Sequence, residues 1–445
     1  MTGFTPSDQG EIDLASHDSF IHGVPFNFFA KLRRDDPVYW QEMPGLDGKG
    51  KGFWSITRHS DILAINREYQ DYSSAHGIRM EDQTEEEYLA RRTFQETDPP
   101  EHSRLRMIVS KAFSRPVVLE YENQIREICI DVIQKALKEQ KIDATKQVAR
   151  QIPMRVLGQI LGAKHEDFEW LVEKGDQLIA NTDPEFTKHV LDQTDTDDYR
   201  LMPFRSPAGI ELFDYAQKLM AEKQRIGDTE GVLSLVLQPD ENGNQISVQE
   251  FRNFFCLLVA AGNDTTRYSI AATLFALASR PALVKQLQEA ARNGGNDSEV
   301  WALAADEMIR WASPTMHFRR TAKRDMVLHG KTIKKGDKVI LWFVSGNRDE
   351  TVFEDPHEIN LSRNPNPHIA FGQGGVHVCL GMWLARLEVK VFLQEWIARV
   401  GAMDLTEPHR YLRSNFIGGI KSLPMDITKG GSDKVALQIQ SDNPP

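Results

Sequence analysis

One stretch decides the fold: Phe371-Gly372-Gln373-Gly374-Gly375-Val376-His377-Val378-Cys379-Leu380-Gly381. Three glycines among its first five residues predict a loop whose backbone takes unusual dihedral angles or closely approaches a flat partner. An amphipathic helix follows through Arg399, so Cys379 falls at the start of a helix. Unpaired N–H groups and the helix dipole at that position stabilise a thiolate, the form of cysteine that acts as a nucleophile or a metal ligand.

Several roles are open to Cys379. It could be a buried, inert thiol, or a catalytic nucleophile with His377, two residues upstream, as its base. A zinc site would need further cysteine or histidine ligands at close spacing, and the sequence offers no such set. A lone thiolate suits heme iron, because the porphyrin supplies four nitrogens and the protein supplies only an axial ligand.

The other two cysteines are expected to be packing residues. Cys129 lies on the apolar face of a helix predicted over residues 125–137, where apolar side chains recur at three- and four-residue spacing. Cys256 lies within residues 254–261, which are apolar on every side. Such a stretch is expected only where protein surrounds a helix completely.

The second decisive feature is a polar cluster inside that long helix. Ser247 and Glu250 form a capping box, and the helix is predicted to run until Arg280-Pro281 stops it. Gly262-Asn263-Asp264-Thr265-Thr266 follows directly on the apolar middle, where burying a carboxylate is costly. Either the helix surfaces there and the cluster meets water, or the cluster is functional. The apolar pattern continues beyond residue 270, which favours a functional cluster.

Composition excludes several classes of protein. The chain has 445 residues with 53 basic and 64 acidic side chains, a formal net charge of −11. Nucleic-acid binding would require clustered Lys and Arg. The central apolar stretch, 254–262, is about half of the roughly 20 residues that span a bilayer. Residues 1–17 lack the basic start and apolar run of a signal peptide. We therefore expect a cytoplasmic protein with no membrane span and no nucleic-acid partner.

The predicted fold is mainly α with small β-sheets. Short strands are expected at 38–40 and 53–57, with a second β region at 326–343. No repeat or low-complexity tract divides the chain. We expect a single domain over 1–445 with flexible ends at about 1–20 and 429–445.

The segment around Cys379 resembles the heme-ligand loop of the cytochrome P450 monooxygenases, and further motifs of that family follow in the same order. Glu307-Met308-Ile309-Arg310 is similar to the family's Glu-x-x-Arg, and Arg363 stands where the third member of that structural trio would be. The resemblance implies the cytochrome P450 fold, a triangular helical prism in one domain. It also implies heme b, with its iron bound by the Cys379 thiolate.

The same resemblance implies the other heme contacts. His102 and Arg106, in a segment similar to the family's helix at the heme edge, would bind a propionate, as would Arg320 and His377. Arg319 would lie on the other face of its extended segment. The remaining contacts would come from the phenylalanine of the loop and from the long helix, where a glycine lets the helix pass close over the iron: Phe371, Ala261 and Gly262.

Asp264 and Thr265 resemble the family's oxygen-activation pair. Thr265 would hydrogen-bond the activated oxygen and Asp264 would relay protons to it, which is general acid catalysis worth about 10²- to 10⁴-fold. This pair implies a monooxygenase that uses O2. Two rivals stay open: a heme-thiolate protein that binds or senses a ligand without turnover, and the Cys379–His377 nucleophilic enzyme.

The loop has one residue more between Phe371 and Cys379 than is usual in the family. In this insertion the sequence resembles the bacterial sterol side-chain hydroxylases. This likeness favours a hydrophobic substrate of steroid, terpenoid or alkyl type. Segments expected to face it are 75–83, 194–209, the helix face at Phe255 and Leu258, 316–318 and 416–420. Within them, Arg79 and Arg205 are either solvated loop residues, the commoner case, or partners of a carboxylate or hydroxyl.

The resemblance also implies redox partners. The predicted heme domain leaves no room for a fused reductase, so we expect electrons from a separate ferredoxin and an NAD(P)H-dependent ferredoxin reductase. An acidic ferredoxin would dock near Arg104, Lys111 and Arg115, on the thiolate side. We expect the protein to be a monomer.

Overall fold

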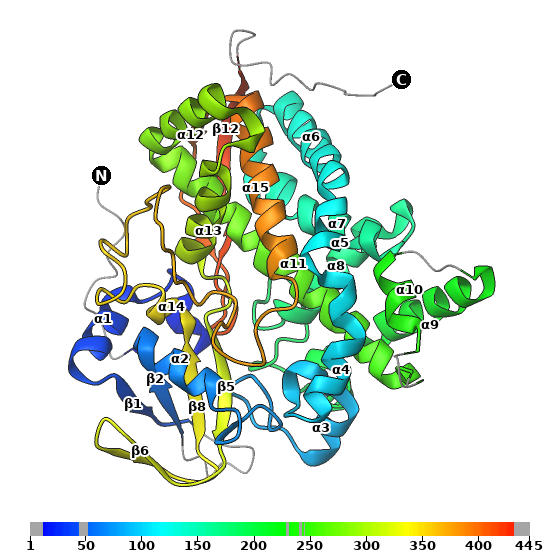
Figure 1. Ribbon diagram of the computed structural model, residues 1–445, viewed down its shortest axis with the longest axis vertical. Coiled ribbons are helices and arrows are strands. Elements are labelled where there is room, and N and C mark those ends of the chain that lie inside the picture. The colour runs from blue at the N-terminus through cyan, green and yellow to red at the C-terminus, as the bar shows by residue number, and fades with distance from the viewer. Residues whose placement is uncertain (1–11, 44–51, 228–230, 240–242, 244, 431–445) are drawn as a thin grey trace.

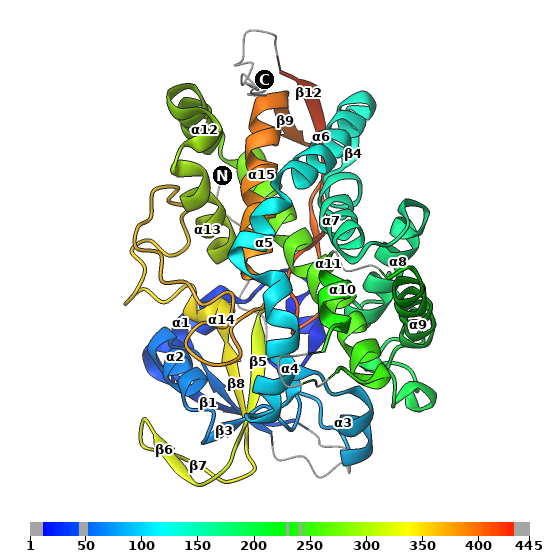
Figure 2. The same ribbon diagram turned by 45° about the vertical axis from the view of Figure 1, so that its right-hand side comes forward.

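The computed structural model describes residues 12–430 apart from 44–51, 228–230, 240–242 and 244. Helices fill the upper and right-hand part of the molecule, and the largest sheet lies below them with the N-terminal helices (Figure 1). A turn of the view by 45° keeps the same division (Figure 2). The predicted class, mainly α with small β-sheets, is confirmed for the described residues.

The long central helix is α11 (Val248–Ser279). Its N-terminus is fixed by the predicted capping box, in which Ser247 and Glu250 bond each other's backbone N–H. The other described helices are α1 (Phe26–Asp35), α2 (His59–Arg67), α3 (Glu85–Arg91), α4 (Glu101–Ser110), α5 (Arg115–Glu120), α6 (Glu122–Glu139), α7 (Gln151–Leu161), α8 (Phe168–Ile179), α9 (Ala208–Ile226), α10 (Gly231–Leu237), α12 (Pro281–Gly294), α13 (Val300–Ala312), α14 (Phe343–Gly346) and α15 (Met382–Arg399).

The described strands form four small sheets. The largest has the order β1-β2-β8-β5-β3, with β2 and β8 parallel and the other pairs antiparallel. A second has the order β4-β12-β9, and β6-β7 and β10-β11 are two-stranded. The strands are β1 (Val38–Gln41), β2 (Phe53–Ile56), β3 (Tyr72–Ser73), β4 (Lys141–Asp143), β5 (His317–Ala322), β6 (Met326–Leu328), β7 (Lys331–Ile333), β8 (Lys338–Trp342), β9 (Val400–Leu405), β10 (Arg410–Tyr411), β11 (Ile420–Ser422) and β12 (Pro424–Lys429).

The main core surrounds α11, which contacts α7, α8, α9, α13 and α15. Cys256 on α11 and Cys129 on α6 are fully buried in this core, so their predicted packing role is confirmed. None of the described helices is long and apolar enough to cross a bilayer.

Part of the N-terminal end that the sequence predicts to be flexible packs against the rest of the chain. Leu14 and Phe20 are buried, and the Phe20 ring stacks on Trp342 with centroids 6.0 Å apart. The apolar side chains on β8 and α1 supplied a surface that the short N-terminal segment covers. At the other end Lys429 belongs to β12 and pairs with Val400. Residues 1–11 and 431–445 lie outside the described part of the chain.

Candidate active site

The glycine-rich loop has the unusual backbone that its sequence predicts. Gly372 and Gly374 have φ of +65° and +109°, in the region that favours glycine. A Cβ on Gly375 would lie 1.8 Å from the carbonyl oxygen of Asn66, the second-last residue of α2. The Cys379 N–H donates to the Phe371 carbonyl at 2.9 Å, which closes the loop around its additional residue.

A large cavity lies between this loop and α11, with a volume of about 1380 Å³ including its mouth. Most of its lining is apolar. Six of the residues predicted for the site line it: Ala261, Gly262, Thr265, Phe371, His377 and Cys379.

The predicted substrate-facing segments also reach this cavity. Each contributes to the wall, through Ile78, Phe204, Leu258, Phe318, and Phe416 with Ile417. Phe255 does not line it: its ring packs against Tyr215 with centroids 5.9 Å apart, so the expectation for Phe255 is wrong. The preceding residue, Phe254, lines the cavity instead, and apolar residues on every side of α11 gave no way to tell the faces apart.

Cys379 opens onto the cavity while protein encloses the thiol on its other sides. Burial raises the pKa of Cys379, while the backbone N–H of Gly381 and the guanidinium groups of Arg106 and Arg386 act to lower it. Helix α15 begins only at Met382, three residues after the cysteine, so its N-terminus alone does not set the ionisation state. A coordinated metal cation deprotonates a bound thiol outright.

The geometry does not favour a nucleophilic Cys379–His377 pair. Neither ring nitrogen of His377 has a hydrogen-bond partner among the described residues, so the imidazole does not activate the thiol. Burial, with Arg320, His102 and Arg106 nearby, lowers the pKa of His377 to about 2. A nucleophile's base should be bonded to it and able to take its proton.

The residues predicted to bind the carboxylates of a cofactor gather around His377. Its ring lies 4.2 Å from that of His102, and Arg106 has a buried Nη1 without a partner. Arg320 is buried and donates to Asn66 at 3.1 Å, while Arg319 points to Asp82 on the other face, as predicted. Buried cationic and imidazole donors without acceptors fit an anionic group at this end of the cavity.

His102 is held differently from the expectation. Its Nδ1 lies 2.8 Å from the carbonyl oxygen of Phe94 and its Nε2 lies 3.0 Å from that of Val376. A contact between His102 and a propionate would have to replace one of these, and it stays a prediction.

The polar cluster of α11 is split between two environments. Thr265 lines the cavity and donates its hydroxyl proton to the Ala261 carbonyl at 2.9 Å. Asp264 is fully buried, does not line the cavity, and lies 2.6 Å from Arg267, which also bonds Asp176 of α8. Burial raises the pKa of Asp264, and the second carboxylate sharing the same guanidinium adds to this rise.

The structure gives a packing reason for a glycine at position 262 that the sequence did not show. A Cβ there would lie 2.9 Å from Cδ2 of Leu157, on α7. The missing side chain therefore lets α11 pack closely on α7, and Leu157 itself lines the cavity. Its predicted role over the iron stays a prediction.

The predicted Glu307–Arg310–Arg363 trio is present. Glu307 is fully buried, accepts two bonds of 2.8 Å from Arg310, and lies 3.1 Å from Nε of Arg363. Asn366 adds a fourth member with a bond of 3.1 Å to the same carboxylate. The network ties α13 to the segment that leads into the cysteine loop.

The sequence interpretation missed Glu388, on α15. It lines the cavity, is buried, and has an Oε2 with no partner among the described residues. Burial raises its pKa well above the ordinary value. A carboxylate between the apolar residues Leu387 and Val389 was the signal that could have identified it.

Comparison with known proteins agrees with this site. A sequence model described as Cytochrome P450 matches residues 22–400. A steroid C26-monooxygenase of Mycolicibacterium smegmatis is 31% identical, covering 97% of each chain. A methyl-branched lipid omega-hydroxylase of Mycobacterium tuberculosis is 33% identical, covering 93% of this chain and 94% of its own. A solved Mycobacterium marinum cytochrome P450 in complex with pseudoionone has a TM-score of 0.80 at 29% identity, covering 96% of this chain and 100% of its own.

The chain therefore belongs to the cytochrome P450 family. It is a P450 monooxygenase whose cofactor is heme b, with the iron bound by the thiolate of Cys379. The thiol that opens onto the cavity and the unpartnered donors around His377 both fit this cofactor. When bound, the heme supplies an iron whose thiolate ligand favours cleavage of the O–O bond.

Proposed function

We propose that this monooxygenase hydroxylates a C–H bond of a hydrophobic small molecule of steroid, terpenoid or alkyl type, using O2. The observation that carries the proposal is that Thr265 and Cys379 line the same mostly apolar cavity. Pockets of this kind bind mainly by shape and by burial of apolar surface. The names of two relatives, a steroid C26-monooxygenase and a methyl-branched lipid omega-hydroxylase, support the same substrate classes.

Thr265 would orient a proton donor within this cavity by accepting a hydrogen bond from it. Because its own proton points to the Ala261 carbonyl, the hydroxyl oxygen keeps a fixed orientation and its lone pairs can accept a hydrogen bond. Asp264, one residue earlier, has a raised pKa and can hold a proton nearer to neutral pH than an exposed aspartate. It would pass that proton on after moving away from Arg267.

Replacement of Thr265 by alanine tests the proposal. We expect Thr265→Ala to keep NAD(P)H and O2 consumption but to lower the product formed per NAD(P)H by about ten- to a hundredfold. Thr273→Ala is the matched control, because Thr273 makes the same i to i−4 bond eight residues later, to the Ser269 carbonyl at 2.8 Å, without lining the cavity. Unchanged coupling in Thr265→Ala would contradict its role. A protein that binds ligand but forms no product would support the sensor alternative.

We further propose that a separate ferredoxin and its NAD(P)H-dependent reductase supply the electrons to a cytoplasmic, monomeric, single-domain enzyme. Arg104, one of the three expected docking cations, is bonded to both Glu101 and Glu250, so these carboxylates already compensate its charge. Arg115 packs its guanidinium 5.2 Å over Trp383, at the start of α15 and thus near the thiolate, and Lys111 is exposed nearby.

Charge reversal tests this docking face. Lys111→Glu and Arg115→Glu should slow reduction by ferredoxin, with a loss that shrinks as salt rises. Lys285→Glu on α12 is the control, since Lys285 is exposed on a distant helix. Equal reduction rates in all three variants would place the ferredoxin elsewhere.

A further inference from the structure

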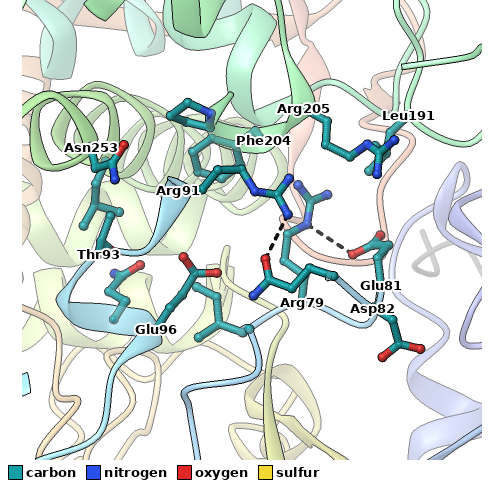
Figure 3. A pocket seen from close by; sticks show the side chains of 16 residues that line it. Arg79, Glu81, Asp82, Arg91, Thr93, Glu96, Leu191, Phe204, Arg205 and Asn253 are labelled. Atoms are coloured by element: carbon teal, nitrogen blue, oxygen red, sulfur yellow. Dashed lines mark hydrogen bonds and ion pairs between the residues drawn. The ribbon is translucent and has the colours of Figure 1, made fainter. Parts of the chain in front are cut away.

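A second pocket adjoins the heme cavity (Figure 3). It has a volume of about 790 Å³ including its opening, and its walls come from the loop before α3, from residues 93–96, from residues 203–205 and from α11. Four residues line both spaces: Ile78, Gln95, Phe204 and Leu257. A single ligand can therefore extend from the heme cavity into this pocket.

Two of the charged side chains in the pocket wall, Arg205 and Asp82, are already neutralised by other residues. Arg205 bonds Glu87 at 2.8 Å and Asp197 at 2.7 Å. Asp82 is paired with both Arg319 and Lys338, at 3.0 and 2.9 Å. The sequence interpretation of Arg205 as a solvated loop residue is therefore wrong, and a ligand would gain little from either group.

Arg79 and Gln83 are different, because their donors lack acceptors. Nε and Nη2 of Arg79 and Nε2 of Gln83 are buried and have no hydrogen-bond partner among the described residues. The orientation of the Gln83 amide is set by its oxygen, which accepts from Arg91 at 2.9 Å. Buried polar groups are almost always hydrogen-bonded in proteins, so three such donors on one wall indicate an absent acceptor.

Arg79 also lies at the boundary between the two spaces. Its guanidinium stacks 4.9 Å above the ring of Phe416, which lines the heme cavity. The side chain is only 15% exposed, so water does not satisfy it as it would a loop arginine. It forms an ion pair with Glu81, whose Oε2 lies 3.5 Å from Nε, beyond the usual hydrogen-bond distance, and Nη2 has no partner among the described residues.

We propose that this pocket binds a carboxylate at the end of the substrate remote from the hydroxylated carbon, with Arg79 as its charged partner and Gln83 as a second donor. The guanidinium of Arg79 can donate two parallel, charge-assisted hydrogen bonds to the two oxygens of a carboxylate, and both groups are charged at neutral pH. The substrate would then be an apolar acid, and this inference rests on the proposed hydroxylation of an apolar molecule in the adjoining cavity.

The neighbouring acids favour a monoanion over a phosphate. Glu81 and Glu96 both line the pocket, so a doubly charged group would meet two carboxylates. Burial raises the pKa of Glu96 to about 7, against the opposing effect of Arg91 and Arg79. Near neutral pH Glu96 is therefore half protonated, and it can donate a hydrogen bond to a carboxylate.

Calorimetry on the heme-loaded enzyme tests the proposal with paired ligands. Decanoic, dodecanoic and hexadecanoic acids are each compared with the alcohol of the same chain length, in wild type, Arg79→Gln and Arg79→Lys. We expect at least one acid to bind about ten- to a hundredfold more tightly than its alcohol. Arg79→Gln should abolish this preference with the alcohol affinity unchanged, and Arg79→Lys should keep part of it. Arg200→Gln is the control, since Arg200 is an exposed arginine outside the pocket.

The proposal is overturned if no acid binds wild type more tightly than its alcohol, or if Arg79→Gln weakens acids and alcohols by the same factor. The heat of binding does not depend on turnover. The Soret band of the reduced carbonyl complex, recorded on the same samples, reports the heme-thiolate site separately. Loss of product formation with an intact acid preference would therefore count against the proposed hydroxylation and not against the carboxylate site.

Discussion

Replacing Glu307 by glutamine removes the charge at the centre of the network that holds the cysteine loop. The carboxylate accepts from Arg310, from Arg363, from Asn366 and from the backbone N–H of Asn360, at 2.8 to 3.1 Å. An amide keeps one acceptor oxygen and turns an NH2 group toward these donors. Two buried guanidinium groups would then lose their counter-charge.

Breaking a buried ion pair by removing one partner typically costs about 3–5 kcal/mol. An unfolding entropy of about 2.1 cal per mol per kelvin per residue gives roughly 0.9 kcal per mol per kelvin for 445 residues. The expected fall in Tm for Glu307→Gln is therefore about 3–5 °C. The loop should also lose part of its hold on the heme.

Thermal unfolding followed by circular dichroism at one fixed scan rate measures the first effect, and the ratio of heme to protein absorbance measures the second. Glu86→Gln is the matched control, because Glu86 forms an exposed pair with Arg200 at 3.4 Å and such pairs contribute little. A Tm for Glu307→Gln within about 1 °C of wild type would refute this account of the network.

Two further predictions concern the loop and the second pocket. Gly375→Ala should reduce heme incorporation and Tm, because its Cβ would meet the Asn66 carbonyl oxygen at 1.8 Å; a heme content and Tm equal to those of wild type would contradict the packing. Glu96 has a folded pKa of about 7 against an ordinary 4.5, so the folded state binds its proton more tightly and wild-type stability should fall as pH rises between these values. The free energy of unfolding of Glu96→Gln minus that of wild type, measured by urea unfolding, should therefore be greater above about pH 7 than below about pH 5, by at most about 3 kcal/mol. A difference that does not change with pH would show that Glu96 does not titrate there.

Features encoded by neighbouring residues could be predicted from the sequence. The bounds of α11 followed from the capping box at Ser247 and from Pro281, and the structure gives Val248–Ser279. The unusual loop backbone followed from its glycines. The trio at Glu307 was found through a family resemblance, which carried the long-range contact to Arg363 that no local pattern contains.

Contacts between distant segments could not be predicted in this way. Asp176 lies on α8, far from Asp264 in sequence, yet it shares Arg267 with it and moves Asp264 into a buried network. Gly262 was interpreted through the cofactor alone, since nothing local pointed to Leu157. Burial of Leu14 depended on a surface assembled from several elements, which a polar N-terminal composition does not reveal.

Asn66 connects three parts of the molecule. Its side chain accepts from Arg320 of β5 and donates to the Gln373 carbonyl, and its own carbonyl lies against Gly375. Local opening in proteins occurs in cooperative units whose members share such contacts. We therefore expect the end of α2, strand β5 and the cysteine loop to open and close as one unit. How firmly the loop holds the metal would then depend partly on a sheet that does not contact the metal.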